Sequence, residues 1–172
     1  MRLRVALRGA DATERLGHAI ADVLEASDVI LLFGELGAGK TTLVRGLVHA
    51  LAEDVEVTSP TFTLRHEYET VPPVCHVDCW RLDQPSDLDE LGLDEVVAGG
   101  GVLVIEWGEL ACARFGDAAL KVQLDDALEG AARVAQLSEA SSRWKPRLAR
   151  LSEALLGYGL AAEVDDTDGA TA

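Results

Sequence analysis

Residues 29–41 read VILLFGELGAGKT, and this stretch decides the fold. Its first five residues form a continuous apolar run, which is typical of a strand covered on both faces in a parallel sheet. Residues 34–41 then match the phosphate-loop pattern G-x-x-x-x-G-K-S/T at every position. Residues 41–51 follow with leucine and valine at helical spacing. The order of strand, glycine-rich loop and helix predicts a phosphate-binding unit.

The loop also indicates what kind of ligand is bound. Successive backbone N–H groups form an anion cradle, and the N-terminus of the next helix adds positive potential. Gly34, Gly37 and Gly39 let the backbone turn and approach phosphates closely. We expect Lys40 to reach the β and γ phosphates of ATP and Thr41 to place its hydroxyl on Mg²⁺. A glycine-rich turn before an ordinary helix is the alternative, which the strand, lysine and threonine together disfavour.

Further elements are expected on both sides of this unit. We predict helices over residues 11–26, 88–97 and 146–156 and a second buried strand over 102–105. Hairpins are predicted from 63–69 with 74–80 and, at a sheet edge, from 120–124 with 133–137. The fold class is therefore α/β, a P-loop NTPase-like three-layer sandwich around a mixed, mostly parallel sheet with antiparallel edge hairpins.

Length and charge limit the domain organisation and the partners. The 172 residues, 48% of them hydrophobic, suit one compact domain over residues 1–140. A helical extension is expected over 141–162, and a disordered acidic tail over 163–172. Thirty acidic residues against 15 basic ones give a net charge of −15, which repels nucleic acid at long range. We therefore expect no direct binding to RNA or DNA.

Targeting signals and cysteines point to the cytoplasm. No run approaches the roughly twenty apolar residues of a membrane span, and the N-terminus lacks the apolar segment of a secretion signal. Cys75, Cys79 and Cys112 show no paired C-x-x-C spacing. Neither a disulfide framework nor a zinc site is expected, and the thiols should be reduced.

Two acidic residues and one threonine are candidates for the chemistry. Glu106 ends the second buried strand, where a parallel sheet gathers ligands, and is predicted to bind the metal rather than be a solvated strand end. Asp78 lies in a strand-like segment, and a second metal-shell or water-orienting role is as well supported as pairing with Arg81. Thr61, in the Pro-stiffened segment SPTF, is placed to sense the γ phosphate or to form an ordinary turn. His76 is interpreted as structural.

Four segments in this order, GELGAGKT, SPTFTL, HVDCWRL and VIEWGE, resemble the bacterial TsaE family over about residues 8–140. The resemblance implies the ATPase component of the machinery that makes threonylcarbamoyladenosine at position 37 of tRNA. It implies weak hydrolysis alone, which resets a complex with a sugar-kinase-like catalytic subunit and that subunit's paralogue. The tRNA would then contact mainly those partners.

The resemblance also assigns residues. It implies catalytic or sensing roles for Lys40, Asp78, Glu106 and Thr61, and a metal site of Thr41, Glu106 and Asp78, which favours the functional interpretation of Asp78. The nucleotide would be bound by Gly34, Glu35, Leu36, Gly37, Ala38, Gly39, Lys40, Thr41 and Thr42. Trp107 would lie beside the nucleotide, and Thr13, a weaker candidate, near the adenine. The family commonly has tyrosine where this chain has Trp80, and nothing is recognised in residues 144–172.

Two other functions use the same loop. A small-molecule kinase usually carries an arginine-rich lid, but between residues 46 and 132 only Arg65, Arg81 and Arg114 occur. A guanine-nucleotide switch generally carries an NKxD segment, which this sequence lacks. The kinase is kept as the alternative, and ATP is preferred over GTP.

Overall fold

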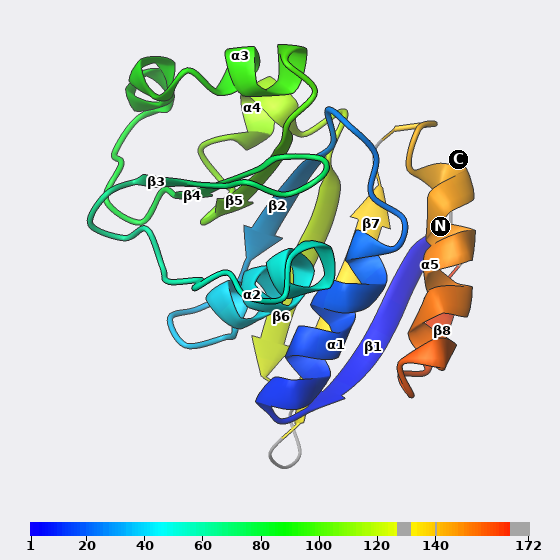
Figure 1. The fold of residues 1–172 in the computed structure, drawn as a ribbon. Helices are drawn as coiled ribbons and strands as arrows, with labels where there is room; N and C mark the ends of the chain where they lie inside the picture. Colours follow the sequence, from blue (N-terminus) through cyan, green and yellow to red (C-terminus); the bar gives the residue numbers. More distant parts are fainter. Residues whose placement is uncertain (127–131, 140, 166–172) are drawn as a thin grey trace.

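The computed structural model describes residues 1–126, 132–139 and 141–165. Within them, one mixed sheet runs through the molecule in the order β3-β4-β5-β2-β6-β7-β1-β8 (Figure 1). The neighbours β4, β5, β2 and β6 are parallel, and the other pairs are antiparallel. The strands are β1 (Arg2–Arg8), β2 (Val29–Phe33), β3 (Arg65–Tyr68), β4 (Val74–Asp78), β5 (Val102–Glu106), β6 (Leu120–Asp126), β7 (Ala132–Glu139) and β8 (Ala162–Asp165).

Helices cover both faces of the sheet, which confirms the α/β fold. One apolar core packs α1 (Ala10–Ala21), α2 (Lys40–Leu51) and α5 (Lys145–Gly157) against one face. A second core lies under the 3₁₀ helix η1 (Pro85–Leu91), α3 (Leu93–Ala98) and α4 (Cys112–Phe115). Strand β2 contributes to both, because alternate side chains point to opposite faces: Ile30 and Leu32 to the first core, Val29 and Leu31 to the second.

The predicted sheet edge is wrong. Strands β6 and β7 do form an antiparallel hairpin, but β6 lies beside β2 and β7 lies beside β1. Strand β1, whose alternate residues Leu3, Val5 and Leu7 are fully buried, was not predicted from the sequence. The additional strand continues the sheet beyond β7, so the edges are β3 and β8.

The C-terminal part also differs from its prediction. Residues 163–165, assigned to a disordered tail, belong to β8, which pairs antiparallel with β1. Trp144, Leu148 and Leu151 are fully buried in the core shared with α1 and β1, so the helical extension packs on the domain. The rest of the predicted tail, residues 166–172, lies outside the described residues.

Three smaller features complete the description of the fold. Gly92, with φ of 60°, breaks the 88–97 segment into η1 and α3. The three cysteines are free, and burial raises the pKa of the Cys79 thiol to about 12. Among the described residues, no helix is long and apolar enough to cross a membrane.

Candidate functional site: a phosphate-loop cavity at the carboxyl ends of the parallel strands

The phosphate loop connects the end of β2 to the start of α2. Gly34 and Gly39 adopt φ of 134° and 103°, a region that side chains disfavour. A Cβ on Gly34 would come within 2.4 Å of the Leu124 carbonyl oxygen on neighbouring β6. Gly34 is therefore required both by its backbone angle and by how closely the loop packs on the sheet.

Lys40 lies inside the loop. Its side chain is buried, and Nζ donates hydrogen bonds to the carbonyl oxygens of Gly34 at 2.6 Å and Glu35 at 3.0 Å. The ammonium also stands 3.7 Å from the ring centroid of Trp107. Burial lowers the pKa of Lys40, while the negative charges of Glu106 and Asp78 oppose that shift. The ammonium is thus held by carbonyls and an aromatic face, close to carboxylates it does not contact.

Glu106 is buried at the end of β5, so it is not a solvated strand end. Its Oε1 accepts a hydrogen bond from the Thr41 hydroxyl at 2.7 Å and lies 2.9 Å from Nε2 of His76 on β4. Within the described part of the chain, no hydrogen bond is made to Oε2. His76 therefore fixes Glu106 from the sheet, while Thr41 approaches it from α2.

Asp78 lies beside Glu106 in the β4–β5 register. Its Oδ2 accepts hydrogen bonds from Thr61 at 2.6 Å and Ser59 at 3.2 Å, and its Oδ1 accepts one from the Trp80 amide at 2.9 Å. The alternative partner Arg81 lies instead over the Phe62 ring, 4.4 Å from its centroid. Asp78 therefore anchors the SPTF segment to the end of β4.

Trp107 closes one side of the site. It has a φ of 57°, unusual for a bulky residue, and its ring lies 4.4 Å from the Trp80 ring at 46°. The next residue, Gly108, donates its amide to the Leu32 carbonyl, which fixes the backbone turn after β5. The sheet therefore holds Trp107 in a strained conformation beside Lys40.

These side chains line one cavity of about 480 Å³. Its lining includes most of the residues predicted for the site: Leu36, Gly37, Gly39, Lys40, Thr41, Thr42, Thr61, Asp78, Glu106 and Trp107. Gly34, Glu35 and Ala38 complete the loop without lining the cavity. Thr13 also does not line it, because its buried hydroxyl contacts the Gly9 carbonyl at 3.5 Å. A role of Thr13 near the adenine stays a prediction.

A family model described as "Threonylcarbamoyl adenosine biosynthesis protein TsaE" matches residues 7–134, which is most of the chain. This chain belongs to the TsaE family.

Individual TsaE proteins and a solved structure agree with this assignment. The chain is 38% identical over 122 residues to a Treponema pallidum (strain Nichols) protein, covering 71% of this chain and 90% of the relative. It is 41% identical over 117 residues to a Streptomyces coelicolor protein, covering 66% and 78%. Both are named tRNA threonylcarbamoyladenosine biosynthesis protein TsaE. The crystal structure of Bacillus subtilis YdiB superposes with a TM-score of 0.74 at 27% identity, over 89% of this chain and 95% of that one.

Three residues that line the cavity of this TsaE-family protein were not predicted from the sequence: Ser59, Trp80 and Arg133. The Ser59 hydroxyl also lies within hydrogen-bond distance of the Thr61 hydroxyl, at 2.6 Å. Ser59 and Trp80 lie within the quoted motifs, so their position next to Thr61 and Asp78 was a usable signal. Arg133 lies far along the chain on β7, and only the pairing of β7 with β6 brings it to the loop. No local pattern identifies it.

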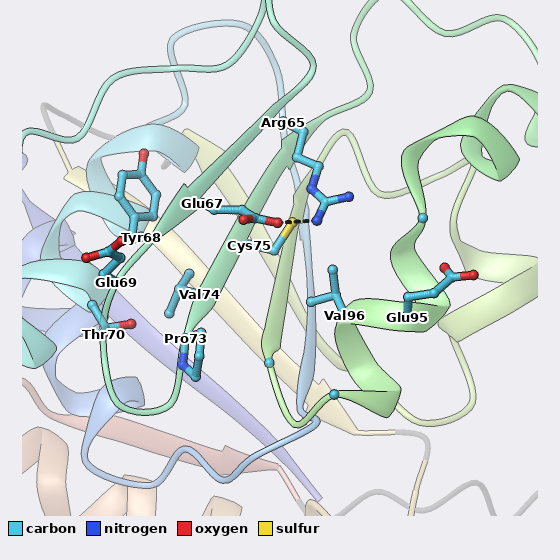
Figure 2. Close-up of a pocket in the computed structure, with 13 residues that line it drawn as sticks. Arg65, Glu67, Tyr68, Glu69, Thr70, Pro73, Val74, Cys75, Glu95 and Val96 are labelled. Atoms are coloured by element: carbon cyan, nitrogen blue, oxygen red, sulfur yellow. Dashed lines mark hydrogen bonds and ion pairs between the residues drawn. The ribbon is translucent and has the colours of Figure 1, made fainter.

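A larger cavity of about 690 Å³ lies elsewhere, between β3, β4 and α3 (Figure 2). Arg65 and Glu67 of β3 form an ion pair there, and Cys75 of β4 and Val96 of α3 border the space. None of the residues predicted for the site is among the described residues that line it. The larger cavity is therefore separate from the phosphate loop.

Proposed function

We propose that this TsaE-family chain binds ATP with Mg²⁺ in the phosphate-loop cavity and hydrolyses ATP during threonylcarbamoyladenosine synthesis on tRNA. The observation that carries the proposal is the juxtaposition of Lys40, the Thr41–Glu106 contact and Asp78 around one cavity. The names of the relatives supply the pathway.

The donor set fits magnesium. The Thr41 hydroxyl, Glu106 and Asp78 offer only oxygen atoms, which a hard cation prefers. Glu106 and Asp78 are buried side by side at the strand ends, where two carboxylates without a cation are costly. Thr41 and Glu106 would hold the ion, directly or through water, with Asp78 nearby. The ion would neutralise charge on the β and γ phosphates.

The residues of the chain supply positioning and charge stabilisation. Lys40 would exchange the carbonyl oxygens of Gly34 and Glu35 for phosphate oxygens, and the loop amides would surround the phosphates. Asp78 would orient the water that attacks the γ phosphate. Because the Thr61 hydroxyl donates a hydrogen bond to Asp78, a movement of the SPTF segment on ATP binding would directly move the Asp78 carboxylate.

The wider role follows from the family. We propose that the chain acts in the cytoplasm with two protein subunits, a sugar-kinase-like catalytic subunit and its paralogue, and that hydrolysis resets their complex between rounds. The net charge of −15 favours tRNA contact through those partners.

The test is ATP hydrolysis by the purified chain, alone and then with the two subunits and tRNA. Lys40→Ala is the inactive control, and phosphate transfer to common metabolites is assayed in parallel. Stimulation by the subunits, lost in Lys40→Ala, would support the proposal. Phosphate transfer to a metabolite without a response to the subunits would replace it with the kinase.

A further inference from the structure

Arg133 is a second cationic group at the phosphate-loop cavity. Its Nη2 donates a hydrogen bond to the Gly37 carbonyl oxygen at 2.7 Å. Its Nη1 would lie 3.0 Å from a Cβ built on Gly39. The guanidinium therefore extends over the loop from Gly37 to Gly39, and it lines the same cavity as Lys40 and Glu106.

The topology explains how Arg133 reaches this position. Strand β6 runs parallel to β2, so its carboxyl end passes beside the start of the loop, where Gly34 packs on Leu124. Strand β7 returns from that end, with Arg133 opposite Asp126 in the ladder. The side chain then crosses from the sheet to the loop.

The contacts of Arg133 leave donors for a ligand. A guanidinium has five N–H donors in a planar fork. Besides Gly37, its described ionic contact is with Asp126 at 3.8 Å, and Asp126 is 90% exposed, so this pair is weak. Among the described residues, none accepts a hydrogen bond from Nη1. The side chain is one-third exposed and lines the cavity, so a ligand in the cavity can contact it.

The charge around the cavity favours an anion next to Arg133. Lys40 is close to Glu106 and Asp78, whose charges act on it. Among the described residues, the carboxylate paired with Arg133 is the exposed Asp126, and no buried carboxylate is paired with it. Within the described part of the chain, the charge of Arg133 is therefore compensated less than that of Lys40.

We propose that Arg133 is a phosphate-binding residue of this site and contacts the polyphosphate chain of the nucleotide. The proposal rests on ATP being the ligand of the cavity. On binding, the guanidinium uses its free Nη1 donors for phosphate oxygens and either keeps or releases the Gly37 carbonyl. Charge-assisted hydrogen bonds of this type fix a phosphate strongly and in a defined direction.

The experiment compares ATP with inorganic tripolyphosphate, which lacks the base and ribose. Dissociation constants are measured by competition against a fluorescent ATP analogue for the wild type, Arg133→Ala and Arg133→Lys. Arg133→Ala is expected to weaken both ligands about 10-fold to 100-fold. Arg133→Lys should recover part of the loss, because it keeps the charge but not the planar fork.

The control variant is Arg8→Ala. Arg8 is an exposed arginine at the end of β1, opposite Ala132, and it does not line the cavity. Arg8→Ala changes the net charge by the same amount as Arg133→Ala, and it should leave the affinities for ATP and tripolyphosphate within about twofold of the wild type. Thermal unfolding of each variant checks that the fold is intact.

Three results decide between the roles of Arg133. Loss of ATP affinity without loss of tripolyphosphate affinity would place Arg133 against the base or ribose and overturn the proposal. Equal losses of affinity for ATP and tripolyphosphate, with a salt dependence of binding unchanged from the wild type, would mean that Arg133 only holds the Gly37 carbonyl in place. This result would also overturn the proposal, since a direct ion contact must be weakened by salt. If the wild type binds ATP, Lys40→Ala abolishes this binding and Arg133→Ala keeps it, the role of Arg133 is refuted but the proposed function is not. A wild type that binds no ATP would refute the proposed function as well.

Discussion

Strand β2 has buried charged residues at both of its ends, and the two groups are built differently. At its amino end, Asp28 accepts hydrogen bonds from Arg147 Nη1 at 2.6 Å and Nη2 at 3.0 Å, and from the Glu25 amide at 2.8 Å. Trp144 stacks on the Arg147 guanidinium at 3.9 Å. At its carboxyl end, Lys40 donates to two carbonyl oxygens and faces Trp107, and among the described residues it forms no ion pair. The neighbouring carboxylates of Glu106 and Asp78 contact hydroxyls, a backbone amide and His76.

The difference separates a structural site from a ligand site. The amino-end pair is closed, because each charge is neutralised by the other and both Asp28 and Arg147, the latter on α5, are buried. At the carboxyl end, opposite charges are held apart around a cavity, an arrangement that suits an added ligand better than stability. Mutations at the two ends should therefore affect different measurements.

The largest effect is expected from Glu106→Gln, which keeps the size of the side chain and removes its charge. Hydrolysis should fall by about 10³-fold or more, because the metal loses a carboxylate ligand and the charge on the phosphates is then neutralised less well. The unfolding midpoint should stay the same or rise, since a buried carboxylate is removed. Steady-state hydrolysis and urea unfolding measure the two.

The matched control is Glu109→Gln. Glu109 is exposed three residues further along the chain and does not line the cavity. Its substitution should leave hydrolysis within about twofold. Normal hydrolysis by Glu106→Gln would show that the metal assignment is wrong.

At the other end of β2, Arg147→Ala should act on stability instead. It leaves Asp28 buried without its main partner, and the free energy of unfolding should fall by about 3–5 kcal/mol. ATP affinity, measured on the folded fraction, should not change. Arg143→Ala removes a more exposed contact to the same aspartate, 3.4 Å away, and should cost about 1 kcal/mol or less. A large loss of ATP affinity in Arg147→Ala would remove the distinction between the two ends.

Most of the carboxyl end could be predicted from the sequence. The phosphate loop is a local motif, so its strand and helix adjoin it in the chain. Glu106 and Asp78 could be found because both end buried strands, and the carboxyl ends of parallel strands lie together. Even so, the Thr41–Glu106 and Thr61–Asp78 contacts join residues 65 and 17 positions apart, and only the fold shows that they form.

The amino end and Arg133 could not be predicted, because both depend on contacts between distant segments. Asp28 and Arg147 lie 119 positions apart, and neither carries a motif. Strand β8 forms from an acidic, weakly hydrophobic segment, and its partner β1 is not among the predicted strands either. Because β1 was not predicted, the β6–β7 hairpin was wrongly placed at a sheet edge. The order of β6, β7 and β1 in the sheet is not encoded in any one segment.

A moderate effect is expected from Thr61→Val, which tests whether the SPTF segment acts through Asp78. The substitution removes the hydroxyl that donates to Asp78 at 2.6 Å and keeps the shape of the side chain. Hydrolysis should fall about tenfold, the value of one hydrogen bond to a charged group, with ATP affinity within about threefold. Thr63→Val is the control, since its hydroxyl contacts His66 outside the cavity. If both variants hydrolyse ATP equally well, Thr61 has no role in the chemical step.

The smallest effect is expected at β8, furthest from the loop in the strand order. Deleting residues 162–172 removes the pairing with β1, and deleting 166–172 keeps it. Because Glu163, Val164 and Asp165 are exposed, the longer deletion should lower the free energy of unfolding by only about 1 kcal/mol relative to the shorter one. Hydrolysis should be unchanged in both, because the cavity depends on the strands from β4 to β7 and not on β8. Reduced hydrolysis in the longer deletion alone would mean that this edge of the sheet supports β7, and through it Arg133, rather than serving stability only.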